Sequence, residues 1–257
     1  MKAQEIFDLT GEVALITGAS TGLGRNFAKV LAANGAKVVV AARSIDKLES
    51  LKSEIEAAGG EALAVKLDVS DREQIAPAFD EAEKTFGTVT LLINNAGISG
   101  SMAGLDMTPE EWRELMAVNL DAPWFAAQQA AKRMIAAETG GTIINIASVA
   151  SFRALKTLAA YGATKAALKQ LTSNLAVELS RHNIRVNAIA PGYILTEINR
   201  EFFESGAGDQ LIKTIPQRRI GDPSDLDGVL LLLASRRAGG FMTGETVIVD
   251  GGQVLGV

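Results

Sequence analysis

VALITGASTGLG, residues 13–24, is the stretch that decides the fold of this chain. It joins an apolar run to a glycine-rich turn, and a helical pattern follows. Gly18, Gly22 and Gly24 permit a tight turn and a close approach of the backbone to a ligand. The helix N-terminus behind them offers free N–H groups and a positive dipole end, which suit a pyrophosphate. The glycine spacing is wider than the usual G-x-G-x-x-G, and an ordinary βα turn is the alternative, but the flanking strand and helix favour dinucleotide binding.

The same alternation of apolar strand and helix recurs along the chain. The predicted strands span residues 13–17, 37–42, 61–69, 90–94, 142–147, 184–190 and 246–250. The predicted helices span about 23–34, 44–59, 71–86, a long stretch from the cap Thr108, 158–181 and 223–235. Continuous apolar strands between helices are typical of a parallel sheet covered on both faces. We therefore expect one α/β domain over residues 1–257, a Rossmann-like doubly wound fold with a seven-stranded parallel sheet, which binds ligands beyond the carboxyl ends of its strands.

Composition excludes several classes of function. The chain has 25 basic and 30 acidic residues without a basic block, which argues against a nucleic-acid partner. No apolar run approaches the roughly 18 residues of a membrane helix, so we expect no membrane partner. The absence of cysteine excludes disulfides and thiolate metal sites and fits a cytoplasmic protein. The single histidine, His182, is expected at a helix C-terminus for structural reasons, and neither a metal site nor a Ser-His-Asp hydrolase is indicated.

The residues after the second predicted strand indicate which cofactor is used. An acidic residue would normally bind the adenine ribose of NAD at this place, which Ala42 occupies, followed by Arg43 and Ser44. No carboxylate repels a 2′-phosphate there, and a guanidinium can pair with one. This pattern favours NADP(H), with NAD(H) possible. The alternative is that Arg43 is only a surface charge at the start of a helix.

Polar residues also follow the third and fourth predicted strands. Asp68 and Val69 follow the third, where the aspartate could cap the next helix or accept a hydrogen bond from an adenine amino group. Asn94-Asn95-Ala96-Gly97 follows the fourth. Its small residues permit close packing against a cofactor, and its asparagines can lock the loop through side-chain hydrogen bonds. A purely structural turn is the alternative for this segment.

The long helix after Thr108 carries Asn119 and Pro123, four residues apart. Proline has no N–H, so the carbonyl of Asn119 loses its usual donor. We expect a kink and a bound water beside the Asn119 side chain, or alternatively a simple kink.

Ser148 follows the fifth predicted strand, and Tyr161 and Lys165 follow at the start of the next helix. Four residues apart, the phenol and the ammonium share a helix face. Such a pair is alone a weak signal, because most are solvated neighbours. Here all of these polar motifs fall at the same predicted edge of the sheet, which points to acid–base chemistry beside a bound cofactor.

The set T-G-x-x-x-G-x-G, N-N-A-G, Asn119, Ser148, Tyr-x-x-x-Lys and P-G resembles the short-chain dehydrogenase/reductase family over about residues 8–253. The resemblance implies a nicotinamide-dependent carbonyl reductase or alcohol dehydrogenase. Tyr161 would be the general acid or base, and the Lys165 ammonium would lower its pKa. Ser148 would hydrogen-bond the substrate carbonyl oxygen, and Asn119 would hold a water that extends a proton path.

The resemblance also implies a cofactor site, and it shows one departure. The cofactor residues carried over, with those argued above, are Gly18, Ser20, Thr21, Gly22, Leu23, Gly24, Arg43, Ser44, Asp68, Val69, Asn95, Ala96, Gly97, Tyr161, Lys165, Pro191, Gly192, Ile194 and Thr196. Many NADP-using relatives have a basic residue where this chain has Thr21. Arg43 is therefore the main candidate for the 2′-phosphate.

A long mixed segment, residues 193–220, is expected to form a lid over the substrate. Phe202 and Phe203 would either close an apolar pocket or pack the lid onto the body. The other candidate substrate contacts are Ser99, Met102, Leu155, Tyr193 and, as an anion anchor, Arg153.

The substrate itself stays open between several classes. Residues 178–197, ELSRHNIRVNAIAPGYILTE, resemble the gluconate 5-dehydrogenase branch, whereas a general ketone or a 3-oxoacyl thioester is equally compatible. A protein that senses NADP without turnover is the rival from another class. The family resemblance alone predicts a homotetramer.

Overall fold

The computed structural model describes residues 2–99, 104–197, 199–206 and 208–256, and it contains the predicted parallel sheet. The strands are β1 Val13–Thr17, β2 Lys37–Ala42, β3 Ala62–Lys66, β4 Leu91–Asn94, β5 Gly141–Ile146, β6 Ile184–Pro191 and β7 Thr246–Val249. Their order across the seven-stranded sheet is β3-β2-β1-β4-β5-β6-β7, with every pair parallel. The order reverses between β1 and β4, which is where ligands bind in doubly wound folds.

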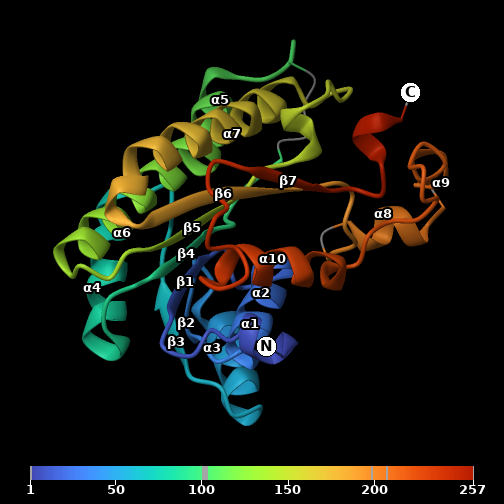
Figure 1. Ribbon diagram of the computed structural model, residues 1–257. Helices are drawn as coiled ribbons and strands as arrows, with labels where there is room; N and C mark the ends of the chain where they lie inside the picture. Colours follow the sequence, from blue (N-terminus) through green and yellow to red (C-terminus); the bar gives the residue numbers. More distant parts are fainter. Residues whose placement is uncertain (1, 100–103, 198, 207, 257) are drawn as a thin grey trace.

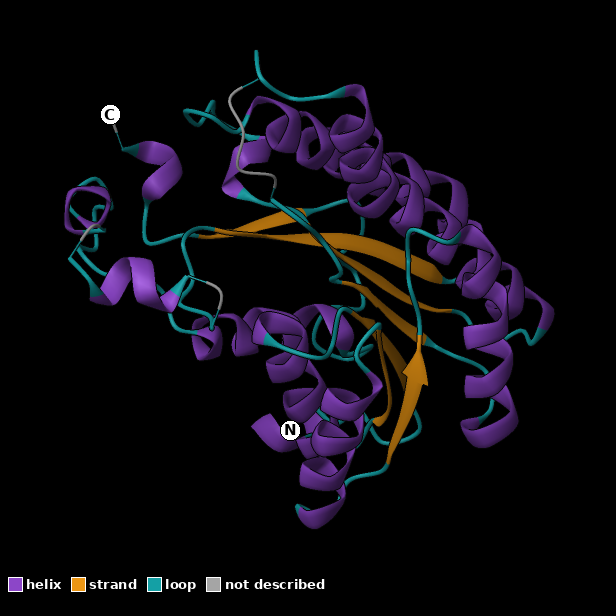
Figure 2. Cartoon of the chain, turned by 180° about the vertical axis from the view of Figure 1, so that it is seen from behind, coloured by secondary structure: helices purple, strands orange, loops and turns teal. Residues whose placement is uncertain are grey.

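Helices cover both faces of the sheet (Figures 1 and 2). They are α1 Ala3–Ile6, α2 Gly22–Ala33, α3 Ile45–Ala57, α4 Ile75–Phe86, α5 Pro109–Met116, α6 Ala122–Ala136, α7 Ala159–Leu179, α8 Arg200–Glu204, α9 Asp209–Ile212 and α10 Asp227–Ala234. One core lies between the sheet and α2, α3 and α10, where Phe27 and Leu48 are fully buried. The other lies between the sheet and α4, α6 and α7, around Phe79 and Met134. Each fully buried side chain of this size contributes roughly 1.5–3 kcal/mol. The predicted fold class is confirmed.

Three buried polar side chains join the centre of the sheet to α7. Asn94 and Asn145 lie opposite each other on β4 and β5, and the Asn94 amide donates to the Asn145 side-chain oxygen at 2.9 Å. The Asn145 amide donates to the Thr172 hydroxyl at 2.9 Å, and that hydroxyl donates to the carbonyl of Leu168. Buried polar groups are tolerated only when paired, so this chain of hydrogen bonds fixes how α7 sits on the sheet.

Most predicted boundaries agree with the structure, but two differ. The strand expected to reach Val69 ends at Lys66, and the helix expected from residue 71 begins as a short 3-10 turn at 72–74 before α4. The helices α8 and α9, within the proposed lid, carry no strong sequence pattern and were not predicted. His182 does end a helix, because a 3-10 turn at 180–182 follows α7 and Asn183 adopts a left-handed backbone conformation with φ 58°.

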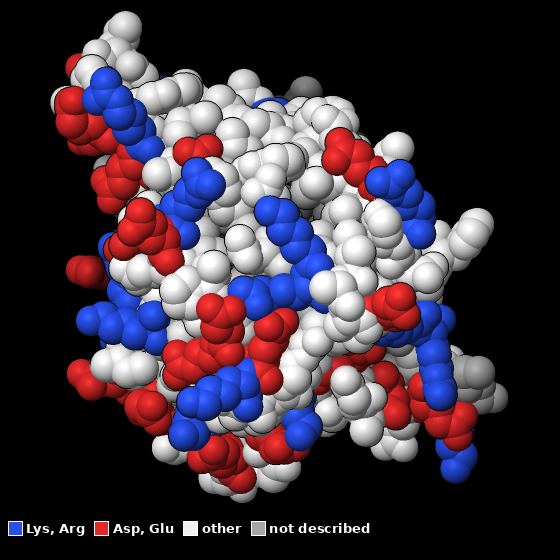
Figure 3. All heavy atoms as spheres, turned by 90° about the vertical axis from the view of Figure 1, so that its left-hand side faces the viewer, with Lys and Arg blue, Asp and Glu red and all other residues white. Residues whose placement is uncertain are grey.

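Charged side chains of both signs lie close together on the surface (Figure 3). On the face in Figure 3, acidic and basic side chains are interspersed rather than gathered into one basic area. Among the residues that the structure describes, we find no helix with the length and apolarity that a membrane crossing needs.

Candidate active site

The glycine turn after β1 is packed so closely that two of its glycines have no room for a side chain. Gly18 has φ +67°, and a Cβ atom on it would lie 2.8 Å from the Cα of Ala96. A Cβ on Gly24, in the first turn of α2, would lie 2.5 Å from the Asn95 side-chain nitrogen. Both distances are shorter than van der Waals contact. The turn therefore lies directly against the loop that follows β4.

Side-chain hydrogen bonds lock that loop to the turn, as the asparagines predict. The Asn95 side-chain amide donates to the carbonyls of Thr17 and Gly18, at 2.9 and 3.2 Å. In return the Thr17 hydroxyl accepts from the main-chain N–H groups of Asn95 and Ala96, at 3.1 and 3.0 Å. Thr17 is part of the glycine motif, but the sequence assigned no role to its side chain. Its hydroxyl lies at the centre of these hydrogen bonds, which we call the Thr17–Asn95 clasp.

The start of α2 fits the pyrophosphate of a dinucleotide. Its N-cap, Thr21, makes no side-chain hydrogen bond to the first turn, so the side chain does not occupy the N–H groups there. Across from the turn, a Cβ on Gly22 would lie 3.5 Å from the Thr196 methyl group. The segment after β6, which follows Pro191 and Gly192, thus faces the glycine turn as the predicted cofactor site requires.

Arg43 and Asp68 lie together at the ends of β2 and β3. Arg43 is exposed, and among the described residues its side chain makes no hydrogen bond or ion pair. The pKa of Asp68 is lowered by hydrogen bonds from Ser70 and, to a smaller extent, by the charge of Arg43. The suggestion that Asp68 caps the next helix is wrong, because Asp71 is the cap and accepts from the N–H of Glu73 at 3.0 Å. The Asp68 carboxylate instead accepts hydrogen bonds from the hydroxyl and the main-chain N–H of Ser70, at 2.7 and 3.0 Å, which form a local turn.

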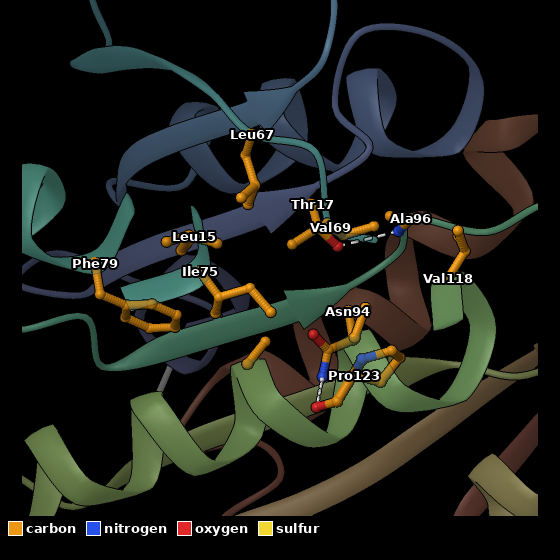
Figure 4. A pocket seen from close by; sticks show the side chains of 12 residues that line it. Leu15, Thr17, Leu67, Val69, Ile75, Phe79, Asn94, Ala96, Val118 and Pro123 are labelled. Carbon is orange, nitrogen blue, oxygen red and sulfur yellow. Dashed lines mark hydrogen bonds between the residues drawn. The ribbon is translucent and has the colours of Figure 1, made fainter. Parts of the chain in front are cut away.

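An apolar cavity opens beside the clasp, between the sheet and the helices α4 and α6 (Figure 4). Val69 and Ala96, two predicted cofactor contacts, line it together with Val118 and Pro123. The cavity measures only about 10 Å³, room for about one water molecule, and the buried side chains of Leu15 and Phe79 close it on the core side, so it is a small void of the core rather than a place for an adenine ring. The cavity was not predicted, since its lining comes from five separate stretches of chain.

The ammonium of Lys165 is buried at the end of β5. The side chain is 4 % exposed, and Nζ donates to the carbonyl oxygen of Ile146 at 2.8 Å. Burial lowers its pKa to about 8. Nζ lies 5.7 Å from the centre of the Tyr161 ring, so the predicted shared helix face is confirmed.

The pKa of the Tyr161 phenol is raised, which corrects the expectation that Lys165 would lower it. Burial of the phenol is the largest cause, and a hydrogen bond with the Ser148 hydroxyl offsets part of the effect. The expectation was wrong for the protein without ligands because it counted charge attraction and left out desolvation. Ser148 and Tyr161 are nevertheless brought together, as their predicted roles require.

Asn119 lies in a π-helical turn, Ala117–Asp121, between α5 and α6. The predicted helix irregularity before Pro123 is therefore present. The Asn119 side chain is fully buried and binds both main-chain groups of Ile98, at 2.9 and 2.8 Å, and the Thr164 hydroxyl at 3.2 Å. These partners use both amide hydrogens of Asn119, so its side chain has little capacity left for the expected water.

Gly97 brings the lysine and the asparagine into one cluster. A Cβ on Gly97 would lie 3.4 Å from both the Asn119 side-chain oxygen and the Lys165 Nζ. The Thr164 hydroxyl, which donates to the carbonyl of Tyr161 at 2.8 Å, closes the connection to α7. Sequence reasoning missed Thr164, although its place between Tyr161 and Lys165 on one helix turn was a signal.

The residues predicted to contact the substrate differ in how far they are buried. Tyr193 is half-buried, burial raises its pKa, and the edge of the Phe203 ring lies against it at 6.1 Å between ring centres. Phe203 thus packs within the segment 193–220, while Phe202 is 49 % exposed. Ser99 is exposed and Leu155 is half-buried. Met102 lies outside the described residues.

Arg153 has partners other than the anion that was suggested for it. Its NH1 group donates to the main-chain carbonyls of Gln253 and Gly256. Its charge also acts on Tyr193, whose pKa it lowers slightly against the effect of burial. Arg153 therefore ties the C-terminal turn to the edge of the site.

The comparison with known proteins agrees with this geometry. A model of the family described as short chain dehydrogenase matches residues 12–206. The chain belongs to the short-chain dehydrogenase/reductase family. Its members are oxidoreductases that act on CH–OH groups, so the predicted family and enzyme class are confirmed.

Individual relatives match along almost the whole chain. Gluconate 5-dehydrogenase of Gluconobacter oxydans (strain 621H) is 38 % identical over 253 residues, covering 98 % of each chain. A 3-oxoacyl-[acyl-carrier-protein] reductase of Synechocystis sp. is 36 % identical, covering 96 % of this chain and 98 % of the relative. The crystal structure of a gluconate 5-dehydrogenase from Burkholderia cenocepacia J2315, in complex with NADP and tartrate, is 39 % identical with a TM-score of 0.94 over all of both chains.

We predict that Lys165→Met stabilises the protein without ligands at neutral pH. The lowered pKa means that the folded state holds the Lys165 proton less tightly than the unfolded state does. Burying the charged Lys165 therefore destabilises the wild-type fold fully below a pH of about 8. This destabilisation disappears as the pH rises toward the pKa of a lysine in the unfolded chain, so the free energy of unfolding of the wild type should increase with pH in that window. Urea unfolding should show the advantage of the variant shrinking by about 2 kcal/mol between about pH 7.5 and about pH 10.

Lys132→Met is the matched control, because Lys132 is an exposed lysine on α6. It should change the free energy of unfolding by less than about 0.5 kcal/mol at either pH. An advantage of Lys165→Met that is the same at both pH values would contradict the assigned burial of the charge.

Proposed function

We propose that this protein is an NADP(H)-preferring oxidoreductase that reduces the ketone of a polyhydroxylated acid, or oxidises the corresponding secondary alcohol. The observation that carries the proposal is the meeting of Ser148, Tyr161, Lys165 and Asn119 at the same sheet edge as the glycine turn. The Gluconobacter and Burkholderia relatives, both named gluconate 5-dehydrogenases, support the substrate class. The Synechocystis relative keeps a 3-oxoacyl thioester as the second candidate.

The residues present suit a nicotinamide dinucleotide, which supplies the hydride when it is bound. The clasped glycine turn and the start of α2 would hold the pyrophosphate, and Val69 and Ala96 would lie along the adenosine. Pro191, Gly192, Ile194 and Thr196 would border the nicotinamide, with the Lys165 ammonium on its ribose. The NADP in the Burkholderia structure supports this assignment.

The proton is the contribution of this chain's own side chains. In reduction, the Tyr161 phenol donates its proton to the substrate carbonyl oxygen, and the Ser148 hydroxyl donates a hydrogen bond to the same oxygen. A raised phenol pKa keeps Tyr161 protonated before the reaction, as an acid requires. When a cofactor and substrate displace water from the site, the nearby Lys165 ammonium stabilises the phenolate left behind. Asn119 positions this group by holding the loop at Ile98 against Thr164.

The segment 193–220 is assigned the role of a substrate lid. A groove lies between it and the end of β7, lined by Tyr193, Ile194, Gln217 and Asp250. The short helices α8 and α9 lie at the outer side of the molecule beside the C-terminus (Figure 1). Because α8 and α9 lie outside the sheet, this segment can open and close without moving the strands.

The decisive experiment is a substrate panel with the purified enzyme. We expect NADPH oxidation, followed by absorbance, with 5-keto-D-gluconate, and little or none with simple ketones or 3-oxoacyl thioesters. Turnover of the thioester alone would favour the second candidate. Cofactor binding without turnover of any member would favour a protein that senses NADP.

Tyr161→Phe is the control variant for that panel. It removes only the phenol oxygen, so turnover should fall at least about 10³-fold while NADPH binding, measured by its fluorescence, is retained. Reduction at near the original rate would exclude Tyr161 as the acid.

Arg43→Ala tests the cofactor preference. Arg43 is the exposed cation at the end of β2 and has no partner among the described residues that would compete with a 2′-phosphate. We expect the Kd for NADPH to rise about tenfold or more, with the Kd for NADH little changed. Lys47→Ala, which removes a neighbouring exposed cation on α3, should alter both affinities only slightly. Equal losses for both cofactors in Arg43→Ala would overturn the assignment.

We further propose a homotetramer in the cytoplasm. Exposed apolar side chains lie on three elements: Trp112 on α5, Val177 on α7 and Ile248 on the edge strand β7. We assign α5 and α7 to one contact between copies and β7 to another. Two distinct self-complementary surfaces are what a tetramer with three two-fold axes requires. Light scattering should give four times the chain mass of 27.0 kDa, and a monomer at micromolar concentration would contradict the proposal. Cell fractionation would test the location.

A further inference from the structure

Buried polar atoms without partners are rare in folded proteins, and the described part of the chain has three on side chains: Arg133 Nε, Ser151 Oγ and Gln253 Oε1. Arg133 is otherwise well paired, since its two terminal nitrogens bind carboxylates on α4. The other two atoms lie at the carboxyl edge of the sheet. Both belong to the segments that Arg153 joins, one just after Ser148 and the other in the C-terminal turn.

The C-terminal turn, residues 250–256, is held in a defined position by several hydrogen bonds. The Asp250 carboxylate accepts from the main-chain N–H groups of Gly252 and Val254, at 2.8 and 2.6 Å. Arg153 donates to the carbonyls at both ends of the turn, and Pro216 of the segment 193–220 packs against Gly252. The Gln253 side chain therefore projects from a fixed backbone, and it is only 3 % exposed.

The Gln253 amide oxygen lies beside the turn that follows β6. A Cβ on Gly192 would lie 2.9 Å from Gln253 Oε1. The charge of Arg153 acts on the next residue, Tyr193, and Tyr193 in turn acts on the pKa of Tyr161, so this turn lies near both Arg153 and the proposed proton donor. Gly192 and Tyr193 therefore connect the Gln253 side chain to the proposed proton donor.

We infer that Gln253 is a specificity-determining residue whose amide oxygen accepts a hydrogen bond from a hydroxyl group of the substrate. The inference rests on the proposed function and adds which residue recognises the polyhydroxylated chain. An amide oxygen needs a donor, which a substrate hydroxyl provides and an acyl thioester chain does not. An acceptor left unpaired in the protein without ligands is a cost that such a donor removes. Gln253 thus favours hydroxylated substrates over acyl chains.

A purely structural role for Gln253 makes the opposite prediction about stability. A side chain that supports the fold lowers the melting temperature when it is removed. A buried polar atom without a partner, in contrast, can be replaced by an apolar group of similar shape at no loss, or with a gain. Methionine has nearly the length and flexibility of glutamine, so Gln253→Met separates these roles.

The test compares full-length wild type, Gln253→Met and the control Gln170→Met, which changes an exposed glutamine on α7. The measurements are KM and kcat for 5-keto-D-gluconate with saturating NADPH, the Kd for NADPH, and the melting temperature without ligands. For Gln253→Met we expect a KM about tenfold higher, a kcat within about threefold, an unchanged Kd, and a melting temperature equal to or above wild type. Gln170→Met should match wild type in all four.

An unchanged KM in Gln253→Met, with wild-type turnover intact, overturns the assignment of Gln253 and leaves the proposed function standing. A higher KM together with a lower melting temperature and weaker NADPH binding overturns it in favour of a structural role. Failure of the wild-type enzyme to reduce 5-keto-D-gluconate overturns the proposed function, and the Gln253 assignment with it.

Discussion

The hydrogen bond from the Lys165 ammonium to the carbonyl oxygen of Ile146 is the interaction on which the rest of the site depends. A buried ammonium is costly unless it finds an acceptor, and a strand interior cannot supply one because its carbonyls are engaged in the sheet. Ile146 is the last residue of β5, where pairing with the neighbouring strands ends and a carbonyl becomes free to turn toward α7. The parallel sheet thus provides the acceptor only at its carboxyl edge, and α7 must start where Lys165 can reach that edge. The Asn145–Thr172 hydrogen bond, one residue back along the strand, sets that position of α7.

The other half of the site is held by hydrogen bonds between neutral side chains and the main chain rather than by charge. The Thr17–Asn95 clasp joins the loops after β1 and β4, the two strands between which the sheet order reverses. Asn119 then fixes the far end of the second loop by binding both main-chain groups of Ile98. Gly97 lies between these two anchors, where a Cβ atom would already be in van der Waals contact with the Asn119 side-chain oxygen and the Lys165 Nζ. The backbone that would face a cofactor is therefore ordered before any ligand arrives, which spares binding the entropy of arranging it.

The sequence predicted those features that depend on interactions between residues close together along the chain, and it missed those that depend on distant residues. The strands and the glycine turn follow from apolar runs and from backbone freedom, which are properties of neighbouring residues, and the irregular helix at Asn119 follows from one missing N–H at Pro123. The direction of the Tyr161 pKa could not be obtained in this way, because it depends on burial by distant segments rather than on the nearby lysine. The same holds for Arg153, whose carbonyl partners are about a hundred positions away along the chain. The prediction that Asp68 caps the helix after β3 was wrong for a more local reason. Asp68 and Asp71 are equally good capping residues, and the position at which β3 ends decides which of them caps the turn before α4.

The proposed cofactor side and the proposed substrate side of the site differ in how freely their residues can be replaced. The proposed cofactor side is built from short motifs whose residues touch one another within a few positions of a strand end, so substitutions there meet backbone atoms and are excluded by sterics, as at Gly18 and Gly24. The proposed substrate side is assembled from the segment after Ser148, the segment 193–220 and the C-terminal turn, whose contacts with each other include side chains such as Arg153, Pro216 and Gln253. Side-chain contacts can be replaced without moving the sheet. A gluconate 5-dehydrogenase and a 3-oxoacyl reductase can therefore both be more than a third identical to this chain, and the residues that decide between such substrates should be sought where those three segments meet.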